Sequence, residues 1–84
     1  MEKYKRTYTK AEIADLRQWF WEHRESFPKS FRMNESTNIP DMAFTVKSLV
    51  ELLDSVDGSN PIYSGQVYFF MQLKEALQAA GYGA

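Results

Sequence analysis

The side chains that could perform acid–base or nucleophilic chemistry are few and isolated in this sequence. His23 is the single imidazole, and the chain has no cysteine. Nucleophilic catalysis needs a nucleophile, a base and a group that orients the base. The helical neighbours expected around this imidazole are Trp19, Phe20 and Phe27, which indicates a half-buried packing residue. We therefore expect no catalytic residue, and a protein that is not an enzyme.

The carboxylates and glycines do not match a known metal or cofactor motif either. Asp54 and Asp57 flank the end of a predicted helix, but no acidic ligands follow Gly58 with the spacing of a calcium loop. Gly58 and Gly65 do not open a helix in the pattern of a phosphate-binding loop. Thiolate zinc sites are excluded because cysteine is absent. The sequence therefore predicts neither a metal nor a cofactor.

A basic segment with interleaved tyrosines precedes the first predicted helix. Its members are Lys3, Tyr4, Lys5, Arg6, Tyr8 and Lys10. Basic side chains can contact phosphates while tyrosines stack on bases, so nucleic-acid association through this arm is one hypothesis. The net charge of −1 is wrong for a dedicated DNA-binding protein. A polar leader ahead of a helix is the simpler interpretation.

Length and hydropathy favour one small domain outside membranes. The chain has 84 residues, which leaves no room for a second module. Its longest uncharged apolar run, residues 67–71, is far shorter than the ~20 residues of a membrane-spanning helix. No apolar segment follows the basic start in the manner of a signal peptide. We expect a cytoplasmic protein without membrane contact.

Three stretches have the periodicity of helices. The first begins at a capping box from Thr9 to Glu12 and should end near residues 25–26, because Pro28 disfavours helical geometry at the residue before it. Its apolar stripe is Ile13, Leu16, Phe20 and Phe27. Trp19 and Trp21 lie on opposite flanks of this stripe. Residues 27–40 predict an ordered extended connection that lays Phe31 and Met33 on the core.

The second helix should be capped by Asp41 and carry the strongest periodic signal. Its apolar positions are Met42, Val46, Leu49, Leu53 and Val56. Gly58 suits the left-handed position after its end. The third helix starts either at Asn60 or at Ser64, and the sequence leaves both open.

The third helix carries two apolar strips. One strip consists of Ile62, Phe69, Leu73, Leu77 and Ala80. The other, about 100° round the helix, consists of Tyr63, Val67, Phe70 and Met71. Gly81 should stop the helix and leave residues 81–84 as a frayed tail.

We predict an all-α fold, a small three-helix bundle with an ordered extended connection between its first two helices. Residues 1–8 would form a flexible leader, residues 9–80 the domain and residues 81–84 the tail. The apolar side chains exceed what a core of this size needs, and a contiguous exposed patch usually marks an interface. The predicted function is a non-catalytic protein–protein interaction or assembly module, with a homodimer included. The candidate partner surface is Trp19, Tyr63, Val67, Phe70 and Met71; packing of these side chains into the core is the competing interpretation.

The order of these motifs resembles that of a known family. The motifs are Leu16-Arg17-Gln18-Trp19-Phe20, Phe27-Pro28, Ile39-Pro40-Asp41, Leu49–Leu53 and Leu73-Lys74-Glu75-Ala76-Leu77. Together they resemble a family of short bacterial proteins classed as a domain of unknown function, over residues 12–78. The resemblance implies a free-standing small helical protein of bacterial or mobile-element origin. It brings no activity and no functional residues.

Overall fold

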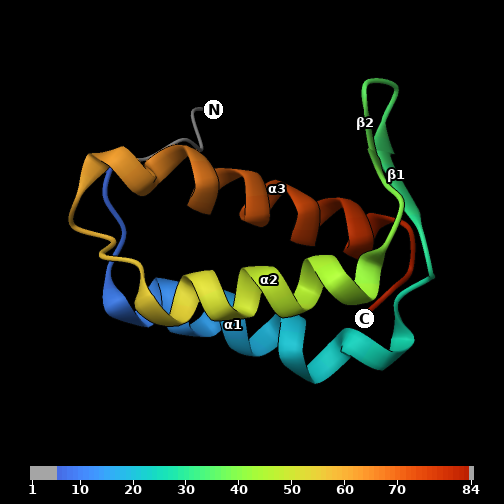
Figure 1. Ribbon diagram of the computed structural model, residues 1–84, viewed down its shortest axis with the longest axis horizontal. Coiled ribbons are helices and arrows are strands. Elements are labelled where there is room, and N and C mark those ends of the chain that lie inside the picture. The colour runs from blue at the N-terminus through green and yellow to red at the C-terminus, as the bar shows by residue number, and fades with distance from the viewer. Residues whose placement is uncertain (1–5, 84) are drawn as a thin grey trace.

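The computed structural model describes residues 6–83, which form three α-helices and one β-hairpin. Figure 1 shows α1 and α3 running in one direction, α2 running back between them in sequence, and the hairpin standing at one end of the bundle. The elements are α1 (Lys10–His23), β1 (Phe31–Asn34), β2 (Thr37–Ile39), α2 (Met42–Ser55) and α3 (Ser64–Ala79), with 3-10 turns at Arg24–Ser26 and Pro61–Tyr63. The three-helix prediction is confirmed, but the fold is not purely helical.

The start of α1 has the predicted capping box. The Glu12 amide donates to the Thr9 hydroxyl at 3.1 Å, and the Thr9 amide donates to the Glu12 carboxylate at 2.9 Å. These two bonds satisfy amides that a helix end leaves without a partner. The α-helix ends at His23, and the 3-10 turn carries the chain to the predicted stop before Pro28.

The connection between α1 and α2 is extended, as expected, but it also pairs with itself. Phe31 lies opposite Ile39 in an antiparallel register, and a bulge interrupts the ladder between Arg32 and Asn34. The Asn34 carboxamide oxygen accepts from the Ser36 amide at 2.9 Å and closes the turn. The strands are only four and three residues long. Such short strands leave too few alternating residues for a period-2 signal, so the sequence predicted the extension and missed the pairing.

Asp41 caps α2, and the predicted apolar stripe of this helix is buried at Met42, Val46, Leu49 and Leu53, whereas Val56 follows the helix and is half-buried. The Asp41 carboxylate accepts from the Phe44 amide at 3.0 Å. The left-handed backbone predicted for Gly58 is wrong. Among the described residues, the glycines with positive φ are Gly81 and Gly83. A β-carbon on Gly58 would instead overlap the carbonyl oxygen of Tyr8 and the side chain of Ile13. The glycine is needed for close approach, not for a left-handed backbone.

Both proposed starts of the third helix correspond to a helical element, one directly after the other. The Asn60 carboxamide accepts from the Ile62 amide at 3.1 Å and caps the 3-10 turn, and α3 follows at Ser64. Ile62 therefore belongs to a tighter turn and does not continue the face of α3. It is 77% exposed, whereas Leu73 and Leu77 are buried.

Residues 81–83, predicted as a frayed tail, lie against the bundle in the structure. Gly81 does stop α3, with a φ of 94°. The Tyr82 amide then donates to the Leu77 carbonyl at 2.9 Å and the Gly81 amide to the Gln78 carbonyl at 3.0 Å. This pair of bonds is a Schellman motif, which fixes the direction of the chain beyond the helix. Ala84 lies outside the described residues.

The core lies between the three helices and continues to the foot of the hairpin. Its buried apolar side chains are Tyr8, Ile13, Leu16, Phe20, Ile39, Met42, Val46, Leu49, Leu53, Val67, Leu73 and Leu77. Tyr8 is among them, so the end of the predicted leader, residues 1–8, belongs to the packed domain. Within residues 6–83, no helix is long and apolar enough to cross a membrane.

Candidate protein-binding surface

The strip of α3 that was predicted as a partner surface faces the core. Val67 is 1% exposed, so its assignment to that surface is not retained. Phe70, Met71 and Trp19 are half-buried and pack against the core, and Tyr63 is half-buried as well. These side chains contribute to folding first.

Met71 is nevertheless partly exposed to solvent. It lines a hollow of about 470 Å³ between α1 and α3, together with Leu16 and Tyr68. Asp15 and Glu75 stand on the two helices beside this hollow. The hollow gives Met71 a partly accessible position, but it does not include Tyr63 or Phe70.

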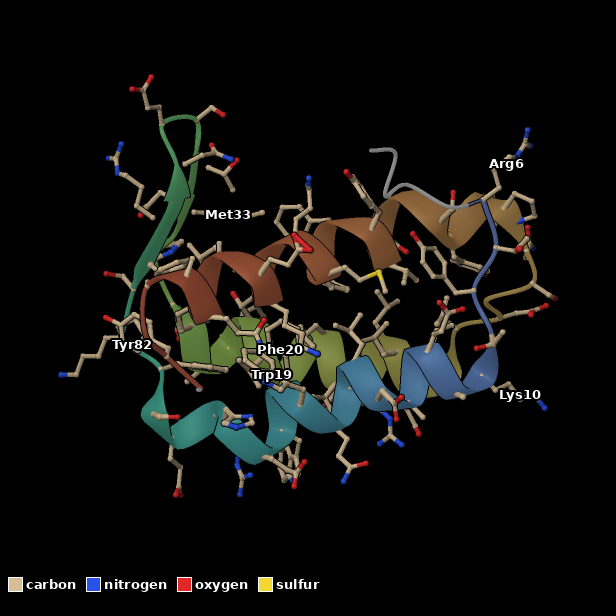
Figure 2. The ribbon with its side chains drawn as sticks, turned by 180° about the vertical axis from the view of Figure 1, so that it is seen from behind. Arg6, Lys10, Trp19, Phe20, Met33 and Tyr82 are labelled. Carbon is tan, nitrogen blue, oxygen red and sulfur yellow. The ribbon has the colours of Figure 1, made fainter. Side chains whose placement is uncertain are left out.

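Trp19 belongs to an aromatic cluster rather than to the outer surface. Its ring lies 5.0 Å from that of Phe20 and 5.5 Å from that of Phe27, measured between centroids. The Lys74 ammonium lies 5.4 Å from the Trp19 ring centroid, at cation–π distance. Figure 2 shows Trp19 and Phe20 together between the helices.

His23 has the packing role expected from the sequence. Its Nδ1 lies 2.8 Å from the Trp19 carbonyl oxygen, and its ring lies 4.9 Å from the Trp19 ring. One ring nitrogen is thereby occupied by a backbone bond within the same helix. Among the described residues, no three histidine, aspartate or glutamate side chains gather as metal ligands would.

Of the predicted nucleic-acid arm, the structure describes Arg6, Tyr8 and Lys10. Lys3, Tyr4 and Lys5 lie outside the described residues. Arg6 and Lys10 are exposed and point outward at one end of the bundle (Figure 2). Tyr8 lies in the core, with its amide donating to the Gly58 carbonyl at 2.8 Å, so its ring is not available for stacking on a base.

Another hollow lies beside the start of α1 and the end of α2. It measures about 850 Å³ and is lined by residues 7–10, 12–14, 17 and 53–59. Several polar groups in its wall serve local structure. Thr9 and Glu12 form the capping box, and the Asp57 carboxylate accepts from the Ser59 hydroxyl at 2.6 Å and the Ser59 amide at 3.0 Å. These hydrogen bonds lower the pKa of Asp57, the hydroxyl bond most. We interpret this hollow as a structural junction.

The sequence predicted only some of the large apolar side chains that are exposed to solvent. Trp21 is 49% exposed, Phe44 67% and Ile62 77%. The sequence placed Trp21 on a flank of the first helix, and the structure leaves it there. Phe44 could have been noticed from its position between the core residues Met42 and Val46, since neighbouring helix positions point in different directions.

Trp21 borders a hollow. The hollow measures about 390 Å³ and lies between α1 and α2, lined by Arg17, Gln18, Trp21 and Val50. The Arg24 guanidinium carbon lies 3.8 Å from the Trp21 ring centroid, and its Nη1 donates to the Trp21 carbonyl oxygen. We call Arg17, Gln18, Trp21, Arg24 and Val50 the Trp21 surface.

The charges of the Trp21 surface are basic and weakly paired. Arg17 contacts Asp54 of α2 at 3.8 Å, and both side chains are solvent-accessible. An exposed ion pair of this length contributes little to stability and exchanges readily with another carboxylate. Two arginines therefore accompany an exposed indole on this surface.

Comparison with known proteins gives a family and nothing more. A family model described as a domain of unknown function (DUF6965) matches residues 11–79. No curated protein and no solved structure matches the chain.

Proposed function

We propose that this chain, which belongs to the DUF6965 family of unknown function, is a non-catalytic module that binds another protein through its Trp21 surface. The observation that carries the proposal is the state of Trp21, whose ring is 49% exposed, held by Arg24 and placed beside a hollow. Tryptophan and arginine are the residue types most enriched among the hot spots of protein interfaces. A ring that is already held loses little side-chain entropy on binding.

The arginines indicate the chemistry of the partner. Arg17 lies in α1 four residues before Trp21, and Arg24 lies in the following 3-10 turn three residues after it. A guanidinium group binds a carboxylate in a bidentate geometry. We therefore infer a partner segment that presents an apolar side chain to the hollow beside Trp21 and a carboxylate to Arg17 or Arg24. The lack of cysteine fits a reducing compartment, and we place this function in the cytoplasm.

The test is crosslinking from the proposed surface in the cells that make the protein. A photoreactive phenylalanine replaces Gln18, which lines the hollow, and in a second strain it replaces Gln72 on the exposed side of α3. We expect a protein that crosslinks from position 18 and not from position 72. Substitution Trp21→Ala should abolish that crosslink, whereas Phe44→Ser should leave it.

The outcome also identifies the class of partner. A crosslinked species of twice the chain's own mass would assign the surface to a homodimer, and sedimentation of the purified protein would then give the same mass. If the same proteins crosslink from positions 18 and 72, or Trp21→Ala changes nothing, the Trp21 surface does not bind a partner.

A further inference from the structure

The chain beyond α3 lies over the aromatic cluster of α1. A β-carbon on Gly83 would lie 2.7 Å from Cζ2 of Trp19 and 3.1 Å from Cγ of His23. A β-carbon at this position would be too close to both rings. The backbone of Gly83 can therefore lie directly against them only because glycine has no side chain. Gly83 also has a φ of 66°, a conformation that other residues rarely adopt.

This covering segment is held by few contacts. Its one large side chain is Tyr82, which is half-buried and meets Phe31 of β1 edge to face at 6.1 Å between ring centroids. The Schellman bonds from Gly81 and Tyr82 fix the turn behind it. Figure 2 shows Tyr82 at the foot of the hairpin, away from the centre of the bundle.

The loss of conformational entropy on ordering this segment opposes these contacts. Gly81 and Gly83 lose more conformational freedom on ordering than any other residue type would. The Tyr82–Phe31 ring pair, the contact of Gly83 with two rings and two backbone hydrogen bonds compensate for that loss, whereas each core helix is fixed by many buried side chains. Opening of this segment should therefore cost less free energy than unfolding of the core.

We propose that Gly81–Gly83 is a strap that opens and closes over Trp19 and His23 while the helical core stays folded. Opening uncovers an aromatic site formed by Trp19, His23 and Phe27, on the flank of α1 opposite to Trp21. The strap is thus a built-in cover, and any ligand of that aromatic site competes with it. This device does not rest on the proposed function, because the strap covers Trp19 and His23 and not the residues that line the hollow beside Trp21.

Amide hydrogen exchange of the unaltered protein tests the strap without any substitution. The amides of Gly81 and Tyr82 should exchange much faster than those of Leu73 and Leu77, although all four are hydrogen-bonded. The reason is that the strap opens locally, whereas the amides of α3 open only with the core. Exchange of the Tyr82 amide at the rate of the Leu73 amide would overturn the proposal.

Quenching of tryptophan fluorescence by acrylamide is the second test. In a Trp21→Phe background Trp19 is the remaining tryptophan, and the closed strap should shield it. Gly83→Val should raise the quenching constant severalfold, since its side chain cannot fit against the two rings. Gly65→Val is the matched control, because a β-carbon there meets nothing within 4 Å. Unchanged quenching in Gly83→Val, with circular dichroism showing intact helices, would contradict the strap.

Discussion

At the scale of single residues, Gly58 shows how one missing side chain sets the packing of a loop. The Tyr8 amide donates to the Gly58 carbonyl at 2.8 Å, and this bond ties the segment before α1 to the loop after α2. A β-carbon on Gly58 would overlap both the Tyr8 carbonyl oxygen and the Ile13 side chain. The backbone oxygen cannot move aside as a flexible side chain could.

Gly58→Ala should therefore lower the free energy of unfolding by about 1–3 kcal/mol, the usual cost of overpacking. Gly65→Ala is the control, because its β-carbon would stand in open space in the first turn of α3. That change should stabilise the protein by ~0.5–1 kcal/mol through the helix propensity of alanine. Urea denaturation of the two variants measures both effects. Equal unfolding midpoints would show that the close approach at Gly58 has no energetic weight.

The lowered pKa of Asp57 predicts how the stability of the protein depends on pH. The hydroxyl of Ser59, then its amide, holds the pKa of the Asp57 carboxyl below the usual value of 3.8. A carboxyl whose pKa is lower in the folded state contributes stability above its unfolded pKa, and this contribution is lost as pH falls through the folded pKa. Asp57→Asn should thus weaken the loss of stability below about pH 4.

Ser59→Ala separates this effect from a general change in charge. It removes the hydroxyl that lowers the pKa most and leaves the carboxylate in place. Thermal melts between pH 2 and 6 should show a shallower acid dependence for this variant also. A Ser59→Ala protein with the full acid dependence of the parent would contradict the assignment.

The residues that could be predicted are those whose partners are close in sequence. Thr9 and Glu12 satisfy each other across three residues, and Asp41 caps an amide three residues ahead, so local spacing was sufficient. Gly58 could not be predicted in the same way. Its constraint comes from the Tyr8 carbonyl, fifty residues earlier, and no local pattern records that approach.

At the scale of elements, the chain passes from the hairpin into a helix at the start of α2. Ile39 is buried at the end of β2, and two residues later the Asp41 carboxylate accepts from the Phe44 amide. The Met42 amide donates backward to the Lys29 carbonyl at 2.9 Å, which joins this turn to the chain entering the hairpin. The cap therefore fixes the position of the hairpin as well as the first turn of the helix.

Asp41→Ala should lower the free energy of unfolding by about 0.5–2 kcal/mol, the range for loss of a helix cap. Asp41→Asn keeps an oxygen in the capping position and should recover most of the loss. Chemical denaturation of the three proteins gives the comparison. An alanine variant as stable as the parent would mean that the neighbouring backbone bonds, not the cap, hold this turn.

The hairpin and the start of α3 mark the limits of prediction for elements. Alternation of Phe31 and Met33 predicted an extended segment, yet pairing depends on Ile39 meeting Phe31 across the turn. At the start of α3 both alternatives were partly right, because Asn60 caps a 3-10 turn that passes into the helix at Ser64. Periodicity indicates the type of an element better than its partners or its exact ends.

At the scale of the whole molecule, the exposed and buried sides of α3 differ from the predicted ones. Val67, Leu73 and Leu77 are buried together, although the sequence placed Val67 on a different strip from the two leucines. Figure 1 shows α1 and α2 along the same side of α3, and their buried side chains share one core with parts of both strips. A helical wheel gives the angle between strips, but the positions of the neighbouring helices decide which angles are covered. The exposed Trp21 on α1 therefore replaces the α3 strip as the candidate surface.

The most direct test of a Trp21-centred surface is the dissociation constant of the complex, measured by calorimetry with the partner captured from position 18. Trp21→Ala should weaken binding by about 30-fold or more, the effect of losing a hot-spot side chain of ~2 kcal/mol. Phe44→Ser is the matched control, because Phe44 is more exposed than Trp21 but borders none of the hollows described here. Its dissociation constant should stay close to that of the parent. Equal affinity of the Trp21→Ala and parent proteins would contradict the account.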